Sequence, residues 1–239
     1  MAVIYLIRHG QASFGDENYD RLSPVGERQS HILGRHFQRV TPKLNSLCSG
    51  GMKRQDHTAE LIRESMGDER PPLHTRPEFS EYDHEALFRA YLPAFFETTA
   101  GNGAQTIDDL LADHRQLERA LRFVLKAWME NMAHEGHAVE TWVDFCRRVS
   151  GGIDDILHAN GPRARIGIVT SGGAITALLR GVLGLSNKRT LGVTLSIYNA
   201  SVTQLYCPGE GRLRDALMLG YNNITHLEMM ADRDLITFR

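Results

Sequence analysis

The chain has 239 residues, of which 42% are hydrophobic, and its 27 basic and 29 acidic side chains nearly cancel. This length suits one α/β domain with a well-buried core. The balanced charge gives no general attraction to nucleic acid or to an anionic membrane, so any anion site has to be local. No apolar run reaches the roughly 18 residues of a membrane span, and the N-terminal run is too short for a signal peptide.

The three cysteines, Cys48, Cys146 and Cys207, are odd in number, widely spaced and without a CxxC pair. Such a pattern favours neither a disulfide framework nor a zinc site. The sequence therefore predicts a protein of the reducing cytoplasm.

The first predicted element is a short apolar strand in the segment VIYLIRHGQ, from Val3 to Gln11. A buried parallel strand suits this run, and Arg8, His9 and Gly10 then fall at its carboxyl end, where open α/β sheets bind ligands. The glycine lets an imidazole approach an anion that a guanidinium holds by a bidentate contact. An Arg-His-Gly triplet also occurs by chance in many chains. The simplest anion of the required shape is phosphate.

With its strand ending in this triplet, the sequence resembles the histidine phosphatase superfamily, in the phosphoglycerate mutase-like branch, over most of its length. The resemblance implies an α/β fold, a three-layer sandwich with a mostly parallel central sheet flanked by helices. It also implies that His9 is the nucleophile and that Arg8 binds phosphate. Gln11 and Ser13, just beyond the triplet, are expected to contact the substrate.

A second segment, DRLSPVGERQS at 20–30, is similar to the family's aspartate and leucine followed by glycine and glutamine on the first helix. Ser23 can cap this helix, because its hydroxyl accepts an orphan N–H group. Pro24 can open it, since proline loses nothing in the first turn.

A third segment, MKRQDHTA at 52–59, resembles the family pattern leucine-x-arginine-alanine-x-glutamine-threonine-alanine. The resemblance places Arg54 as the second phosphate-binding arginine. The chain departs from the pattern at the alanine and glutamine positions, which are Gln55 and His57 here.

The segment FSEYDHE at 79–85 is similar to the stretch that holds the family's acidic proton donor. An isolated glutamate is usually a surface charge, so it is the resemblance that selects Glu81, with Glu78 and Glu85 as poorer candidates. His84 is a candidate substrate contact and a candidate cation near this acid, although a lone histidine is more commonly a surface residue.

The region of about 86–139 is expected to form a largely helical insertion within a single domain spanning 1–239, and to decide the substrate. The glycines of AGNGAQT at 100–106 predict a loop. Apolar residues at helical spacing then predict one long helix from Thr106 to Met132, with Thr106 as its cap. The same spacing predicts a further helix over 141–158.

The segment IGIVTSGGAITALLRGVLGL at 166–185 predicts a second buried strand, a glycine turn and an amphipathic helix. In the family this turn reads serine-histidine-glycine, and its histidine contacts the phosphoryl group. Here the position is Ser171, whose hydroxyl can donate one hydrogen bond, while the N–H groups of Gly172 and Gly173 can hold an anion. A neutral donor stabilises phosphoryl charge less than an imidazolium.

The C-terminal part predicts extended segments over 191–198 and 201–207, with PGEGR at 208–212 as a hairpin turn between strands. The sequence LGYNNITHLE resembles the closing segment of the family, and His226 is interpreted there as structural.

Other motifs give no second chemistry. The HEGH sequence at 134–137 lacks the spacing of the HExxH zinc motif, and the chain has neither a GxxxxGK[ST] loop nor a GxGxxG after a strand. We therefore expect no bound metal, no nucleotide cofactor and no other cofactor.

These patterns predict a cytoplasmic phosphatase that hydrolyses small phosphomonoesters through a phosphohistidine. His9 attacks phosphorus, Arg8 and Arg54 neutralise the phosphoryl oxygens, and Glu81 protonates the leaving alkoxide and then assists water. A carboxylate or carbonyl should hold one ring N–H of a neutral His9, but the sequence does not identify it. The alternatives are a phosphoglycerate-type mutase and a non-catalytic phosphometabolite-binding protein. The expected partner is a small phosphorylated substrate, not nucleic acid or membrane, and a homodimer is left open.

Overall fold

The computed structural model describes residues 1–13, 20–40, 43–99, 106–134, 138–208 and 212–238. Its strands are β1 Ala2–Arg8, β2 Ser46–Ser49, β3 Leu73–Thr75, β4 Arg165–Thr170, β5 Val202–Cys207 and β6 Leu217–Asn223. Its helices are α1 Pro24–Val40, α2 Lys53–Ser65, α3 His84–Thr99, α4 Ile107–Ala112, α5 His114–Met129, α6 Trp142–Asn160, α7 Gly172–Leu183, α8 Asn187–Thr194 and α9 Thr225–Glu228.

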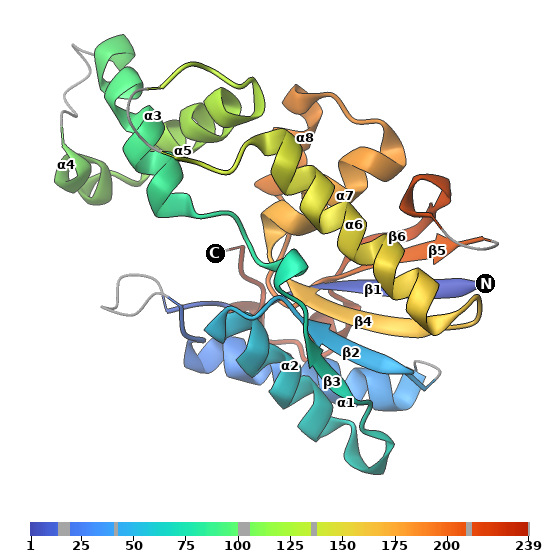
Figure 1. Cartoon of the computed structure of the whole chain (residues 1–239). Helices are drawn as coiled ribbons and strands as arrows, with labels where there is room; N and C mark the ends of the chain where they lie inside the picture. The colour runs from blue at the N-terminus through green and yellow to red at the C-terminus, as the bar shows by residue number, and fades with distance from the viewer. Residues whose placement is uncertain (14–19, 41–42, 100–105, 135–137, 209–211, 239) are drawn as a thin grey trace.

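The central sheet has six strands in the order β3-β2-β4-β1-β5-β6. The first four strands in this order are parallel to one another, β5 pairs antiparallel with β1, and β6 pairs antiparallel with β5. Figure 1 shows α1 and α2 on one face of the sheet, α6 and α7 on the other, and α3 to α5 grouped at one end of the molecule. The predicted fold class, a three-layer α/β sandwich with a mostly parallel sheet, is confirmed.

Strand β1 lies in the middle of the sheet because both of its faces are apolar. Ile4 and Leu6 belong to the core beneath α6 and α7, whereas Tyr5 and Ile7 pack with α1 and α2 on the opposite face. All four side chains are buried, and burying each stabilises the fold by about 1.5–3 kcal/mol. The apolar run therefore fixes where the residues that follow Ile7 emerge.

One helix start agrees with its predicted cap, and a second has a cap that the sequence analysis did not name. The hydroxyl of Ser23 accepts a hydrogen bond of 3.1 Å from the backbone N–H of Gly26 at the start of α1. The hydroxyl of Thr141 accepts one of 3.1 Å from Asp144 at the start of α6.

The prediction of one long helix from Thr106 to Met132 is wrong. The helix begins at the predicted cap, where Thr106 accepts a bond of 3.2 Å from the N–H of Asp109, but α4 ends at Ala112 after only 6 residues. Asp113 then caps a new helix, α5, by accepting from the N–H of Arg115 at 2.8 Å. An aspartate side chain that bonds the backbone in this way competes with a continuous helix.

The extended segment predicted over 191–198 is also wrong in its first half, which belongs to helix α8. Ser186 caps this helix by accepting from the N–H of Arg189 at 3.4 Å, and Asn187 ties its start to α5 through a bond of 2.7 Å to the carbonyl of Met129. The predicted strand over 201–207 is confirmed as β5. Residues 209–211 of the predicted hairpin turn, residues 100–105 of the predicted loop and residues 135–137 of HEGH lie outside the described residues.

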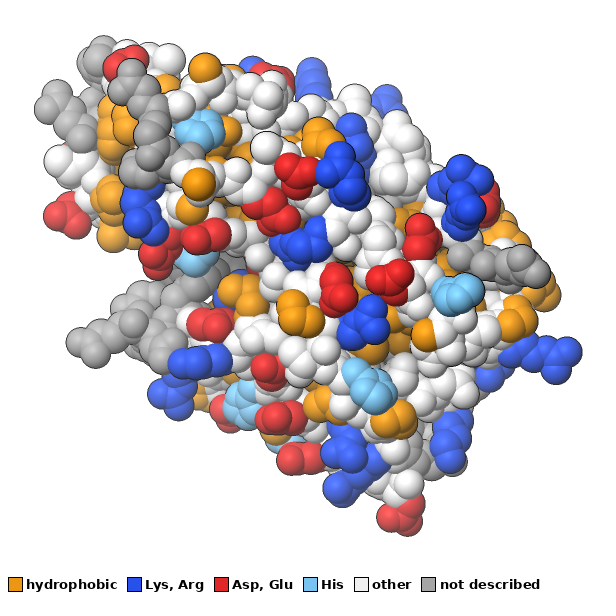
Figure 2. Space-filling view, in the orientation of Figure 1, with side chains coloured by type: hydrophobic (Ala, Val, Ile, Leu, Met, Phe, Trp, Pro, Cys, Tyr) orange, Lys and Arg blue, Asp and Glu red, His pale blue; other side chains and the backbone are white. Residues whose placement is uncertain are grey.

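The surface agrees with the balanced composition. Figure 2 shows acidic and basic side chains interspersed over the face that it presents. All three cysteines lie in the described part of the chain, and none of them forms a disulfide. Among the described helices, none combines the length and apolar character needed to cross a bilayer.

Candidate active site

His9 follows β1 directly, at the carboxyl edge of the parallel strands. Its backbone N–H donates to the carbonyl of Thr170 at the end of β4 (2.9 Å), and its carbonyl accepts from the N–H of Ala200 (3.2 Å). The next residue, Gly10, packs against the first turn of α1, where a Cβ would lie 2.4 Å from the carbonyl oxygen of Gly26. Glycine is therefore required here, and the backbone that carries the imidazole is held by the end of β4 and by the residues that precede β5.

The ring of His9 is neutral, with its Nε2 atom directed at Arg54. Nδ1 lies 2.7 Å from the carbonyl oxygen of Gly10, which can only accept, so Nδ1 carries the hydrogen. Nε2 accepts a hydrogen bond of 3.1 Å from Nε of Arg54. Burial and the charges of Arg54 and Arg8 hold the pKa of His9 well below its usual value. The carbonyl that the sequence analysis required but did not identify is that of Gly10.

Arg54 lies in the first turn of α2 and is oriented by Asp20. Its Nη1 donates to the Asp20 carboxylate at 2.7 Å, and the same carboxylate accepts from the backbone N–H groups of Lys53 (3.0 Å) and Arg54 (3.4 Å). An acidic side chain at this position is stabilised by the helix dipole as well as by the ion pair. The sequence analysis noted Asp20 in its motif without giving it a role.

Arg8 is anchored through its Nη1 atom. This atom donates to the carbonyl of Phe238 at 2.7 Å and to the carbonyl of Ile197. The ring of Phe238 lies on that of Tyr198, with centroids 4.1 Å apart. Nε of Arg8 lies near α7, because a Cβ on Gly172 would be 3.9 Å from it. Segments remote in sequence thus hold the guanidinium near the start of α7.

Glu81 lies against the N-terminus of α7. One carboxyl oxygen accepts from the N–H of Gly173 (2.9 Å) and the other from the N–H of Tyr82 (3.2 Å). Burial raises the pKa of Glu81 above its usual value, and this influence exceeds the lowering by the two N–H groups, Arg54 and Arg8. The carboxyl group therefore favours its protonated form more than an exposed glutamate does.

The other two candidate acids, Glu78 and Glu85, belong to different ion pairs. Glu78 lies 3.4 Å from Arg76, and Glu85 lies on the exposed face of α3, 3.6 Å from Arg89. Glu81 is the acid whose pKa responds to both arginines beside His9. The geometry thus favours the choice made from the resemblance.

Ser171 is the N-cap residue of α7 and is buried, but its side chain does not cap the helix. Its Oγ instead accepts a hydrogen bond of 2.8 Å from Nε2 of Gln55. The N–H of Gly173, expected to hold an anion, donates to Glu81 in this structure. Gln55 is a residue that the sequence analysis recorded as a departure from the family pattern without assigning it to the site.

The remaining predicted substrate contacts are Gln11, Ser13 and His84. The side-chain oxygen of Gln11 accepts from the hydroxyl of Ser23 (2.8 Å), and the hydroxyl of Ser13 donates to the carbonyl of Leu22 (3.2 Å). Both therefore connect the chain after His9 to the segment before α1. His84 is exposed at the first residue of α3.

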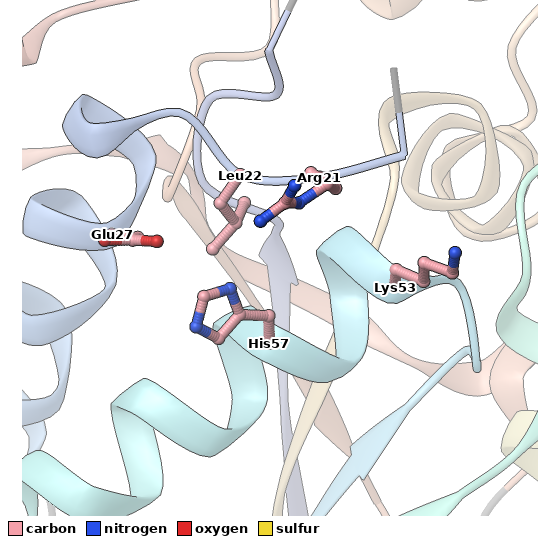
Figure 3. A pocket seen from close by; sticks show the side chains of 5 residues that line it. All are labelled: Arg21, Leu22, Glu27, Lys53 and His57. Atoms are coloured by element: carbon pink, nitrogen blue, oxygen red, sulfur yellow. The ribbon is translucent and has the colours of Figure 1, made fainter. Parts of the chain in front are cut away.

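A pocket of about 370 Å³ lies between the first turns of α1 and α2 (Figure 3). It is lined by Arg21, Leu22, Glu27, Lys53 and His57. Basic and acidic side chains both face it, and its lining contains none of the predicted catalytic residues. Lys53 connects it to the site, because the N–H of this residue shares the Asp20 carboxylate with Arg54.

The sheet has the strand order β3-β2-β4-β1-β5-β6, and a buried histidine, two arginines and an acid lie at the carboxyl edge of its parallel strands. This fold is that of an α/β protein of the phosphoglycerate mutase-like type. The family model for histidine phosphatase superfamily (branch 1) matches residues 4–88 and 111–217, and the chain belongs to that superfamily. Residues 89–110 lie outside this match, and a single domain with an insertion at about 86–139 stays a prediction.

Solved structures share the fold at low sequence identity. YhfR of Bacillus stearothermophilus is 17% identical with a TM-score of 0.65, covering 95% of this chain and 100% of its own. Phosphoglycerate mutase from Bacillus anthracis is 18% identical with a TM-score of 0.62, covering 97% of both chains. Phosphoserine phosphatase from Entamoeba histolytica, in complex with 3-phosphoglyceric acid, is 16% identical with a TM-score of 0.61, covering 95% of this chain and 100% of its own. No curated protein matches the sequence.

Proposed function

We propose that this protein is a phosphatase of small phosphomonoesters that acts through a phosphohistidine on His9. The observation that carries the proposal is the neutral ring of His9, whose Nδ1–H is held by the Gly10 carbonyl and whose Nε2 faces Arg54 at 3.1 Å. A nucleophilic nitrogen with a guanidinium beside it is what an incoming phosphoryl group requires.

In the first half of the reaction, the lone pair of His9 Nε2 forms a bond to phosphorus while the bond from phosphorus to the ester oxygen breaks. Glu81, with its raised pKa, gives its proton to the departing alkoxide. Arg54 exchanges its hydrogen bond with Nε2 for one with a phosphoryl oxygen, and Arg8 neutralises a second oxygen.

In the second half, the Glu81 carboxylate takes a proton from water as the water oxygen attacks phosphorus. The bond between phosphorus and Nε2 breaks, and its electron pair returns to the neutral ring of His9. Inorganic phosphate leaves, and Glu81 is again protonated. The two arginines supply the positive charge, so this mechanism needs no metal or other cofactor.

The substrate contacts complete the proposal. Ser171 and Gly172 lie at the start of α7, beside the end of β1, where a phosphoryl oxygen is to be bound. Gln11, Ser13 and His84 are proposed to contact the remainder of the substrate. A cytoplasmic location and a homodimer stay predictions.

Labelling of the protein tests the proposal. We expect incubation with a radiolabelled phosphomonoester, followed by a quench in alkali, in which phosphohistidine survives, to give a labelled wild-type protein. His9→Ala should give none, and the matched control His158→Ala, an exposed histidine on α6, should be labelled as the wild type.

The fate of the label separates the three functions. Loss of the label to water, with release of inorganic phosphate, supports a phosphatase. A label that persists until a second hydroxyl substrate removes it would replace the proposal by a mutase. Binding of inorganic phosphate without any label would indicate a non-catalytic binding protein.

A further inference from the structure

The side-chain amide of Gln55 has a fixed orientation. Gln55 is fully buried, and its Oε1 accepts a hydrogen bond of 3.3 Å from the backbone N–H of Met52 at the start of α2. Because Oε1 faces this donor, the NH₂ end of the amide must point in the other direction. Nε2 indeed donates to Oγ of Ser171 at 2.8 Å.

This bond decides what the hydroxyl of Ser171 can do. A hydroxyl has a single hydrogen and accepts through its oxygen lone pairs. Since Oγ of Ser171 accepts from Gln55, its hydrogen points away from the Gln55 amide. The amide of Gln55 has no acceptor on its NH₂ end, so it cannot take this hydrogen.

The hydroxyl lies beside the proposed phosphoryl position. Arg8 of β1 pairs in register with Thr170 of β4, so the residues that follow, His9 and Ser171, emerge side by side at the carboxyl edge. From the other side, Gln55 follows Arg54, whose Nε contacts the ring of His9. Ser171 and Gln55 are also two positions at which the sequence departs from the family pattern described above.

We propose that Gln55 is a positioning residue that turns the hydroxyl of Ser171 to donate a hydrogen bond to the bound phosphoryl group. This inference rests on the proposed phosphatase function. Gln55 and Ser171 together replace the charged histidine donor of the family pattern by a neutral hydroxyl donor. The protonation state of this hydroxyl is the same throughout the pH range of the reaction.

A double-mutant cycle tests the pair. Gln55→Met keeps the approximate size of the side chain without its hydrogen bonds, and Ser171→Ala removes the hydroxyl. We expect each single variant to lower kcat by about tenfold with little change in KM, because Ser171→Ala removes the donor to a developing charge and Gln55→Met removes the bond that orients it. The double variant should be no slower than Ser171→Ala, since Gln55 acts through Ser171. If the loss of kcat in the double variant equalled the product of the two single losses, the inference would be overturned.

Affinity for vanadate gives a readout that does not depend on turnover. Gln55→Met and Ser171→Ala should each weaken vanadate binding, and the double variant should equal Ser171→Ala. The control His57→Ala, on α2 but facing the pocket between α1 and α2, should bind vanadate as the wild type does. Thermal unfolding of every variant shows whether the fold is retained.

The two proposals fail in different ways. If wild-type protein carries no label on His9 but the cycle in vanadate affinity is non-additive, the phosphatase proposal fails and the pair stands as an anion-binding device. If His9 is labelled and the Gln55→Met variant, folded as the wild type, retains full kcat and full vanadate affinity, the positioning role of Gln55 is refuted.

Discussion

Asp20 accepts a hydrogen bond of 2.7 Å from Nη1 of Arg54, and Nε of the same guanidinium donates to Nε2 of His9 at 3.1 Å. Asp20 takes no part in the proposed reaction, but its carboxylate fixes the plane of the Arg54 guanidinium, which faces the proposed nucleophile His9. Because Asp20 also accepts from backbone N–H groups of α2, the helix and the guanidinium are oriented by one side chain.

We expect Asp20→Asn to weaken the affinity for inorganic phosphate about threefold to tenfold, because the amide holds Arg54 less firmly than a carboxylate does. Asp20→Ala should lose more, since it also removes the acceptor at the start of α2. Titration of phosphate by calorimetry checks both variants. Tighter binding by either one would show that Asp20 acts chiefly by opposing the anion's charge.

Arg54→Ala and Arg8→Ala should each weaken vanadate binding, since each removes a charge-assisted contact worth about 1.5–3 kcal/mol. Arg54→Ala should also raise the pKa of His9, because its charge is among the causes that lower that pKa. The affinity follows from inhibition of hydrolysis, and the pKa from NMR titration of the His9 ring. Unchanged vanadate affinity in Arg54→Ala would show that the alignment of its motif was wrong.

We expect Glu81→Gln to slow hydrolysis of sugar phosphates far more than that of p-nitrophenyl phosphate, whose phenolate leaves without a proton. In the wild type, kcat/KM for the poor leaving group should have a bell-shaped pH profile. It should decrease as the pH rises through the raised pKa of Glu81, which loses its proton, and also as the pH falls through the lowered pKa of His9, which gains one. The variant should lose the limb at high pH. Equal losses on both substrates would assign the acid role to another residue.

A separate pair of histidines predicts sensitivity to acid. The rings of His36 and His226 lie 5.5 Å apart where α1 meets α9, and burial lowers the pKa of His226 to about 3. In the unfolded chain, His226 binds a proton near its ordinary pKa of about 6.5, whereas in the folded protein it stays neutral down to about 3. The contribution of neutral His226 to stability is therefore complete above pH 6.5 and is lost as the pH falls toward 3.

We therefore expect His226→Phe to reduce the drop in Tm between pH 7.5 and pH 5, relative to the wild type. Calorimetry at the two pH values measures this difference. His158→Phe, at an exposed position on α6, serves as the matched control and should retain the wild-type drop. An unchanged drop in His226→Phe would remove this histidine as the acid-sensitive group.

The sequence predicted the parts of the molecule that depend on strong local patterns. Strand β1 with its Arg-His-Gly end and strand β4 with its glycine turn are short, mostly buried apolar runs, so their character and their carboxyl ends could be assigned directly. The same holds for the caps at Ser23 and Thr106, which depend on residues within one turn. The choice of Glu81 depended on the resemblance rather than on any local pattern.

What escaped prediction depends on tertiary contacts or on competition between local structures. Gln55 and Ser171 are 116 residues apart, and only the packing of α2 beside the end of β4 brings them together. Apolar residues at helical spacing continue across Asp113, whose own side chain ends one helix and begins the next. In α8, the cap at Ser186 overrides a stretch whose composition also suits a strand.

The contact between Gln55 and Ser171 also predicts how a histidine would be accepted at position 171. Gln55 is fully buried and its Nε2 lies 2.8 Å from the serine oxygen, so Ser171→His alone should clash with the amide and lower activity. The double variant Gln55→Ala/Ser171→His opens room for the imidazole. We expect it to exceed Ser171→His in kcat by roughly tenfold, if about 1.4 kcal/mol of transition-state stabilisation is gained from a cationic donor. Its pH profile should gain a new ionisation near the ordinary pKa of histidine. Equal activity of the single and double variants, with both folded, would show that Gln55 does not occupy the space that an imidazole needs.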